Sequence, residues 1–314
     1  MTCGALCAAD WISIVANVLT IPVYTVLLVV LFVFRRSLNS TFFTFCISTG
    51  VADLWISLHK FAFTKIPRVL FYDDVFANKS MATMSKMGVW YIYLAQVFGV
   101  LLMSLNRYTA LVYPLRHKTL WSPTVIFVAL LLQWLLPLIT VVPMLFPQFH
   151  SHFANITLHP TFDQENARDL YFLVDGVIEG LLLTPLFVTL YVCMFVKSRN
   201  FAVQQRKRSI RRTVIMQTAD ECTALSISNM DVYMPMDFAA EKRLACTGLV
   251  LTVSYVAMNV PTVATIFYDQ SPPWISYAWY FANDVFTMSN PYLLLLFGAQ
   301  VRRCFIRYVT LGAQ

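Results

Sequence analysis

The stretch Ile12–Phe34 reads ISIVANVLTIPVYTVLLVVLFVF and contains no Asp, Glu, Lys or Arg. A helix crosses a bilayer with about 20 predominantly apolar residues, so this stretch is long enough to span a membrane. Six further apolar stretches follow, and with the first they define expected spans at about 12–34, 41–60, 87–107, 124–146, 170–197, 243–268 and 274–298. The sequence therefore predicts an all-α membrane protein, a bundle of seven transmembrane helices.

The composition indicates one membrane domain over residues 1–314. The chain is 58% hydrophobic and 12% charged, against about 25% charged in an average soluble domain. The spans leave a third inner loop over 197–242, with an expected mobile insertion at 213–240, and a short tail over 299–314. No length remains for a soluble catalytic domain, and no span carries an HExxH or GxSxG arrangement. We therefore expect no enzyme, no metal site and no cofactor.

The Lys and Arg residues gather on one side of the predicted spans. Seventeen of the 23 fall on the side of the third loop and the tail, and the other six, Lys60 and Lys65 among them, fall on the opposite side. Cytoplasmic loops carry such an excess, so we expect the N-terminus outside and the C-terminus in the cytoplasm, in the plasma membrane. The net charge of +7 then indicates topology and contact with anionic lipids, and not nucleic acid binding.

Three glycosylation sequons bear on the same orientation. Those at Asn78 and Asn155 lie in loops that the charge distribution places outside, and the one at Asn39 lies in an inner loop. We therefore expect sugar on Asn78 and Asn155 but not on Asn39.

Polar residues inside the spans indicate inward faces, because ionisable groups within a membrane are costly and are candidates for function. Asp53 lies in the middle of the second span, Gln96 lies in the third and Asn290 lies in the seventh. We predict that these three side chains form a polar network inside the bundle. The alternative is structural hydrogen bonding between helices without a ligand, which is common in membrane proteins.

A second polar and aromatic set falls in the outer half of the spans. Asp175 and Glu179 are four residues apart and so share one helix face. The predicted ligand pocket consists of Trp90, Tyr93, Asp175, Glu179, Tyr280, Asn283 and Asp284. Its carboxylates could select a cationic or hydrogen-bonding group of a small ligand, or simply hydrate a cavity. An aromatic belt at the membrane interface explains part of the same pattern.

The inner end of the third span carries a more specific motif. Residues 105–118 read LNRYTALVYPLRHK, and Leu120 and Trp121 follow. This string resembles the Glu/Asp-Arg-Tyr region of G-protein-coupled receptors, and more closely the nematode serpentine chemoreceptors of the class gamma and class V group. The string Asn290-Pro291-Tyr292 is similar to the seventh span of the same group.

The resemblance implies a receptor that senses an extracellular small molecule and couples to a heterotrimeric G protein. It assigns the coupling switch to Asn106, Arg107, Tyr108, Asn290, Pro291 and Tyr292, with Arg107 at the cytoplasmic water boundary. The chain departs from the receptor pattern at Asn106, where an acidic residue is usual, and it has no Cys near the outer end of the third span. A transporter of a small solute is the alternative, although the two halves of the sequence show no internal repeat.

Overall fold

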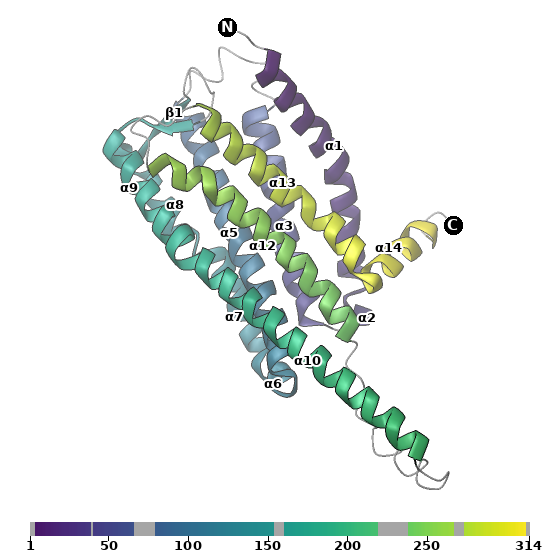
Figure 1. The fold of residues 1–314 in the computed structure, drawn as a ribbon. Helices are drawn as coiled ribbons and strands as arrows, with labels where there is room; N and C mark the ends of the chain where they lie inside the picture. The colour runs from purple at the N-terminus through teal and green to yellow at the C-terminus, as the bar shows by residue number, and fades with distance from the viewer. Residues whose placement is uncertain are drawn as a thin grey trace.

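The computed structural model describes residues 4–38, 40–65, 79–153, 160–218, 238–266 and 273–311. Long helices run side by side through the molecule (Figure 1). They are α1 (Gly4–Val33), α3 (Thr41–Lys60), α5 (Lys79–Val112), α7 (Pro123–Leu135), α10 (Thr184–Thr218), α12 (Phe238–Ile266) and α13 (Pro273–Phe297). The shorter helices are α2 (Arg35–Leu38), α6 (Pro114–Leu120), α8 (Leu138–Val141), α9 (Glu165–Asp175) and α14 (Ala299–Leu311).

Most of the seven long helices have enough residues to cross a membrane. Within the described residues, five stretches are also apolar enough: Trp11–Val33, Thr41–Phe63, Lys79–Val112, Pro123–Leu145 and Glu165–Asn200. Helices α12 and α13 add 29 and 25 residues, more than the roughly 20 that a crossing requires. The predicted all-α membrane fold is therefore confirmed. Asn39, Asn78, Asn155 and residues 219–237 of the expected insertion lie outside the described residues.

The fourth and fifth spans are interrupted where Pro residues lie inside them. Pro has no backbone N–H and its ring clashes with the preceding turn, so it breaks or kinks a helix. In the fourth span α7 gives way to α8 and then to the 3₁₀ turns η2 (Val142–Leu145) and η3 (Pro147–Phe149). In the fifth, α9 continues into the π-helix η4 (Gly176–Leu183), which ends two residues before Pro185. A second π-helical segment, η1 (Phe61–Lys65), extends α3.

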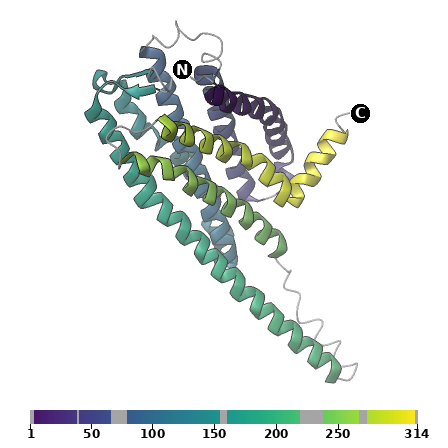
Figure 2. The same ribbon diagram turned by 45° about the horizontal axis from the view of Figure 1, so that its top comes forward.

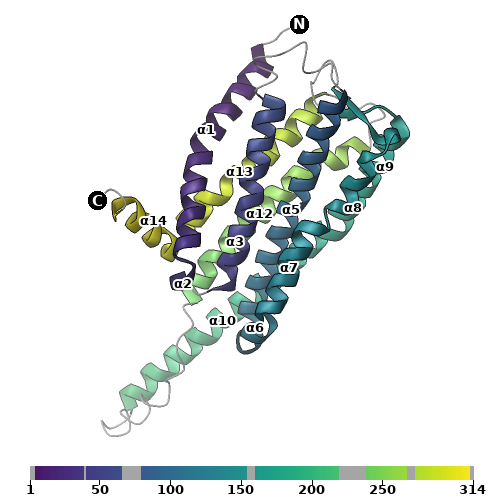
Figure 3. The same cartoon turned by 180° about the vertical axis from the view of Figure 1, so that it is seen from behind.

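The two ends of the bundle differ. At one end the strands β1 (Ser151–Phe153) and β2 (Pro160–Phe162) pair antiparallel and lie over the ends of α5 and α9 (Figures 1 and 3). At the other end α14 turns away from the bundle, and α10 extends well beyond its neighbours (Figures 1 and 2). We name the hairpin end the outer end, following the expectation from charge.

Large apolar side chains fill the centre of the bundle. Tyr24, Phe45, Phe187, Tyr255 and Phe286, from α1, α3, α10, α12 and α13, are among the largest that are fully buried. The fourth span buries only 17% of its most apolar window, so it lies at the edge of the bundle where lipid would cover it. Polar side chains inside this apolar bundle are therefore the exceptions that indicate a site.

Candidate functional site

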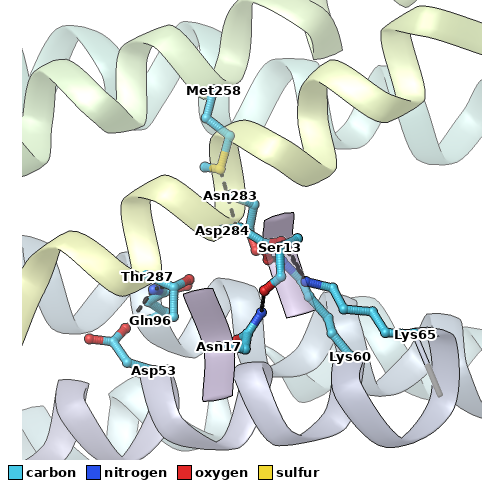
Figure 4. A network of polar contacts seen from close by, with 10 residues as sticks. All are labelled: Ser13, Asn17, Asp53, Lys60, Lys65, Gln96, Met258, Asn283, Asp284 and Thr287. Atoms are coloured by element: carbon cyan, nitrogen blue, oxygen red, sulfur yellow. Dashed lines mark hydrogen bonds and ion pairs between the residues drawn. The ribbon is translucent and has the colours of Figure 1, made fainter. Parts of the chain in front are cut away.

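A polar network in the middle of the bundle centres on the buried carboxylate of Asp53. Gln96 Nε2 donates to Asp53 Oδ1 at 2.5 Å, and Asn290 Nδ2 donates to Asp53 Oδ2 at 2.7 Å. The Tyr24 hydroxyl donates to the same Oδ2. Gln96 also donates to Thr287 Oγ1 at 3.1 Å (Figure 4). The structure thus brings together the three residues predicted for an intramembrane network. We name these five residues the mid-bundle network, which joins α1, α3, α5 and α13.

A second cluster lies nearer the outer end and joins α1, α3, η1 and α13 (Figure 4). Lys60 Nζ lies 3.0 Å from Asp284 Oδ1, and Lys65 Nζ lies 2.7 Å from Asp284 Oδ2. Lys60 also donates to Asn283 Oδ1, while Lys65 donates to Ser13 Oγ and Ser13 donates in turn to Asp284. The side chains of Lys60, Lys65 and Asp284 are 2%, 7% and 12% exposed, so their charges are withdrawn from water. We name these five residues the lysine cluster.

Sequence reasoning counted the two lysines only as charges on the outer side of the spans and did not predict their contact with Asp284. Lys60 and Lys65 are five residues apart, which in an α-helix separates them by about 140° around the axis. The segment η1 is π-helical, with hydrogen bonds to the fifth residue along, and this wider turn carries both ammonium groups to one carboxylate. The sequence does contain a pattern that could have indicated this contact. Two lysines lie at the end of an apolar span, and another span contains an Asp without a basic residue near it in sequence.

Tyr93 and Glu179 of the predicted pocket meet between α5 and η4. The Tyr93 hydroxyl donates to Glu179 Oε2 at 2.7 Å, and both side chains are buried. The Tyr93 ring packs edge-on against Trp279, with the centroids 5.5 Å apart, and Trp279 packs in the same way against Tyr280. Lys60 Nζ lies 5.9 Å from the Trp279 centroid. These contacts connect the Tyr93–Glu179 pair to the lysine cluster.

Trp90 lies one layer further out, against the hairpin. Its ring packs edge-on against Tyr171 at 5.3 Å between centroids, and Tyr171 also packs against Phe149 and Phe162. Lys86 is buried, and its Nζ lies 3.1 Å from the centroid of the Phe162 ring. The residues of the predicted pocket therefore lie in separate places. Tyr93, Glu179 and Tyr280 are connected through Trp279, whereas Asn283 and Asp284 belong to the lysine cluster. Trp90 packs under the hairpin, and the side chain of Asp175 lies outside the described part.

Charged side chains fasten the hairpin to the bundle. Asp163, directly after β2, has carboxylate oxygens 2.8 Å from His152 Nδ1 and 3.0 Å from Lys79 Nζ at the start of α5. Burial by itself would raise the pKa of the Asp163 carboxyl, but the hydrogen bonds from His152 and Lys79 outweigh it, so the pKa lies below its ordinary value. The Ser151 amide donates to Thr83 Oγ1 at 3.0 Å. The hairpin is thus tied to α5 by a carboxylate that is charged at neutral pH.

Arg107 lies buried at the inner end of α5, and the expectation that it sits at the water boundary is wrong. It is 4% exposed, and its guanidinium carbon lies 3.7 Å from the centroid of the Phe42 ring on α3. A cation over an aromatic face is attracted by the ring, and more strongly once water is excluded, so the Phe42 ring stabilises the buried guanidinium. Asn106 turns elsewhere and donates through Nδ2 to Thr41 Oγ1 at 2.8 Å.

A small cavity lies beside Arg107 between α3, α5, α10, α12 and α13. Its walls include Arg107, Ser104, Tyr191, Thr247 and Asn290, and the hydroxyls of Ser104 and Tyr191 lie 2.9 Å apart. The free space accommodates about one water molecule. Because Asn290 belongs both to this cavity and to the mid-bundle network, the inner site and the middle of the bundle share a residue.

The remainder of the third-span motif folds back on itself. Thr109 Oγ1 accepts a hydrogen bond from Trp121 Nε1 at 2.7 Å and lies 3.1 Å from His117 Nδ1. These contacts hold the short helix α6 against α5. Tyr108 packs edge-on against Tyr113, with 6.3 Å between the ring centroids. Thr109, His117 and Trp121 of the motif thus contact one another across the tight turn between α5 and α6.

The seventh-span part of the predicted switch is divided. Asn290 and Pro291 are buried, whereas Tyr292 is 46% exposed and its hydroxyl lies 3.2 Å from Thr20 Oγ1 on α1. The structure therefore brings Arg107 and Asn290 to one cavity and turns Tyr292 toward a different helix.

Comparison with known proteins identifies relatives along almost the whole chain. The family model described as "Serpentine type 7TM GPCR chemoreceptor Srv" matches residues 13–311. A relative from Caenorhabditis elegans, described as "Serpentine receptor class V-1", is 24% identical over 306 residues, which is 96% of this chain and 90% of the relative. The matched range contains the lysine cluster, the mid-bundle network and the inner cavity.

Proposed function

Because the chain belongs to the Srv family of serpentine seven-transmembrane chemoreceptors, we propose that it senses a small molecule at its outer end and signals to a heterotrimeric G protein at its inner end. Membership makes it a multi-pass protein of the plasma membrane and places it among receptors, which are generally not enzymes. The resemblance drawn from the third-span and seventh-span motifs is confirmed by this family.

One observation carries the proposal: polar sites at the two ends of the bundle are connected through shared helices. The Tyr93–Glu179 pair and the lysine cluster occupy the outer half, and the cavity beside Arg107 occupies the inner half. Between them the mid-bundle network joins α3, α5 and α13, each of which also contributes to both end sites. Two sites are coupled when the protein has at least two conformational states and binding at each site changes their populations. Helices that carry polar groups at both ends connect the two sites physically.

The proposed switch at the inner end consists of Asn106, Arg107, Tyr108, Asn290, Pro291 and Tyr292. In the described arrangement Arg107 is held over Phe42 beside a cavity of about one water molecule, where a protein partner does not reach it. Activation in this proposal separates the inner helix ends and frees the guanidinium for the G protein. The Lys and Arg residues of 197–212 would extend the same surface and contact anionic lipids.

The proposed orientation places the N-terminus and the hairpin outside and the tail in the cytoplasm. Its support is the concentration of Lys and Arg in the loops and tail at the α6 and α14 end of the bundle. The long inner extension of α10 carries part of this charge. A small-molecule ligand would then enter from the hairpin end.

The test compares Arg107→Ala with wild type in cells that express the chain and are exposed to an odorant panel, with calcium as the readout. Arg107→Ala is expected to reach the surface in normal amount and to lose the response. Arg116→Ala is the matched control, because Arg116 is exposed on α6 at the same end of the bundle. It removes the same charge and is expected to keep the response.

Nucleotide exchange on a purified G protein, measured with the reconstituted chain, separates coupling from indirect calcium signals. Wild-type signalling by Arg107→Ala would remove Arg107 from the mechanism. A wild-type chain that binds a panel compound but never accelerates nucleotide exchange would refute the receptor proposal, and solute flux under the same conditions would favour a transporter.

A further inference from the structure

The lysine cluster holds more positive than negative charge. Lys60 and Lys65 contribute two ammonium groups, and within the described residues the carboxylate that contacts them is that of Asp284. Both of its oxygens are engaged, one by each lysine. The other partners, Ser13 and Asn283, are neutral. The described cluster therefore has one ammonium group more than it has carboxylates, in a place nearly closed to water.

Charge withdrawn from water is unfavourable unless an opposite charge accompanies it. One carboxylate balances one of the two ammonium groups, so an anion beside the lysines would complete the set. A cation brought to the same place would meet the repulsion of the excess positive charge. For Asp284 the cluster argues against the option of selecting a cationic group, because both oxygens of this carboxylate are already engaged by ammonium groups.

Aromatic rings beside the cluster indicate the rest of such a ligand. Lys60 Nζ lies 5.9 Å from the centroid of Trp279 and 5.7 Å from that of Tyr280, and Tyr93 packs against Trp279. Small-molecule sites combine apolar and aromatic walls with a few converging polar groups. A compact apolar body that carries one carboxylate is complementary in chemistry to the rings and to the ammonium groups.

We propose that the lysine cluster binds the carboxylate of a small organic acid, with Lys60 and Lys65 donating hydrogen bonds to its oxygens. Asp284 acts as a positioning residue that holds the two lysines side by side. This inference rests on the proposed receptor function and names the chemical class of its ligand. Ionised donors and acceptors form the strongest hydrogen bonds in proteins, so the carboxylate is the group on which recognition depends.

The experiment uses the purified full chain in lipid nanodiscs and a fixed probe set. The probes are hexanoate, octanoate and benzoate, each paired with its methyl ester, and sodium chloride and sodium sulfate are run in parallel. Binding is read as the rise in unfolding temperature with probe concentration. At least one acid is expected to bind at least tenfold more tightly than its ester. Equal binding of acids and esters, or equal stabilisation by the inorganic salts, would overturn the proposal.

Variants locate the binding. Lys65→Met is expected to weaken acid binding about 10- to 100-fold, the range for losing a hydrogen bond to a charged group, and to leave ester binding unchanged. Lys79→Met is the matched control, because Lys79 is an exposed outer lysine paired with Asp163, and it is expected to bind acids like wild type. If Lys65→Met does not fold, the double variant Lys65→Met/Asp284→Asn removes one charge of each sign and retains Lys60. It is expected to keep a preference for acids over esters, and loss of that preference would overturn the proposal.

Cell responses to the same probes distinguish this inference from the proposed function. Acid binding that depends on Lys65, without any G-protein response, would leave the site standing and refute the receptor function. Responses to esters or amines, with no binding of acids, would leave the receptor function standing and refute the lysine cluster as an acid site.

Discussion

Replacing Asp53 with Ala tests how strongly the mid-bundle network holds the helices together. The change removes hydrogen bonds from Tyr24, Gln96 and Asn290, on three other helices. Hydrogen bonds between membrane helices contribute about 0.6 kcal/mol each on average, so three of them amount to about 2 kcal/mol of unfolding free energy. Thr20→Val is the matched control, because it keeps the side-chain shape and removes a single contact, to Tyr292. We expect it to lose about 0.6 kcal/mol.

Cys46 provides the assay, because its thiol is free and fully buried on α3. A fluorogenic maleimide labels it only when the bundle opens, so the labelling rate follows the open population. A loss of about 2 kcal/mol corresponds to labelling about 30-fold faster, and a loss of about 0.6 kcal/mol to about threefold. All variants carry Ser in place of the other six cysteines, Cys3, Cys7, Cys193, Cys222, Cys246 and Cys304, so that Cys46 is the one thiol left for the maleimide. If Asp53→Ala labels no faster than Thr20→Val, the network does not hold the helices as argued.

Two further predictions concern the outer end. Peptide mapping is expected to find sugar on Asn78 and Asn155, and sugar on Asn39 alone would invert the proposed topology. Asp163→Asn at neutral pH is expected to speed hydrogen exchange in β1 and β2 about two- to fivefold, as for a partly exposed ion pair, whereas Asp169→Asn should have no such effect. Because the pKa of Asp163 is lowered, its contribution to the stability of the hairpin is present above the ordinary pKa of about 3.9 and is lost as the pH falls below that value. At low pH the exchange rate of the wild type, corrected for the intrinsic effect of pH, should then approach that of the variant. A difference in exchange rate that does not change with pH would contradict the assignment.

The spans could be predicted from the sequence because insertion into a bilayer depends mainly on the composition of each segment itself. The inward positions of Asp53, Gln96 and Asn290 followed from the same physics, since a polar group inside a membrane requires a partner. Lys60 and Lys65 could not be placed in this way. Their position depends on the π-helical geometry of η1 and on a carboxylate from another helix, and neither is encoded in local hydropathy.

The inner end shows the same limit. The motif located Arg107 at the end of its span, but its burial depends on the Phe42 ring of a neighbouring helix. The direction of Tyr292 depends likewise on Thr20 of α1. The hairpin strands are three residues each, too short for an alternating pattern to indicate a strand. The long helices could be predicted from the sequence, but the contacts between them could not.

The length of α10 gives the bundle a mechanical property. Its 35 residues extend over about 52 Å at 1.5 Å per residue, while the hydrocarbon layer is about 30 Å thick. The outer end of α10 adjoins η4, the segment that carries Glu179, and the inner end projects past the other helices (Figure 2). A tilt of about 5° at η4 would sweep the far end through about 4.5 Å over this length. If η4 is the pivot, helix α10 acts as a lever, and a sub-ångström adjustment of Glu179 against Tyr93 would reach the inner tip of α10 magnified severalfold.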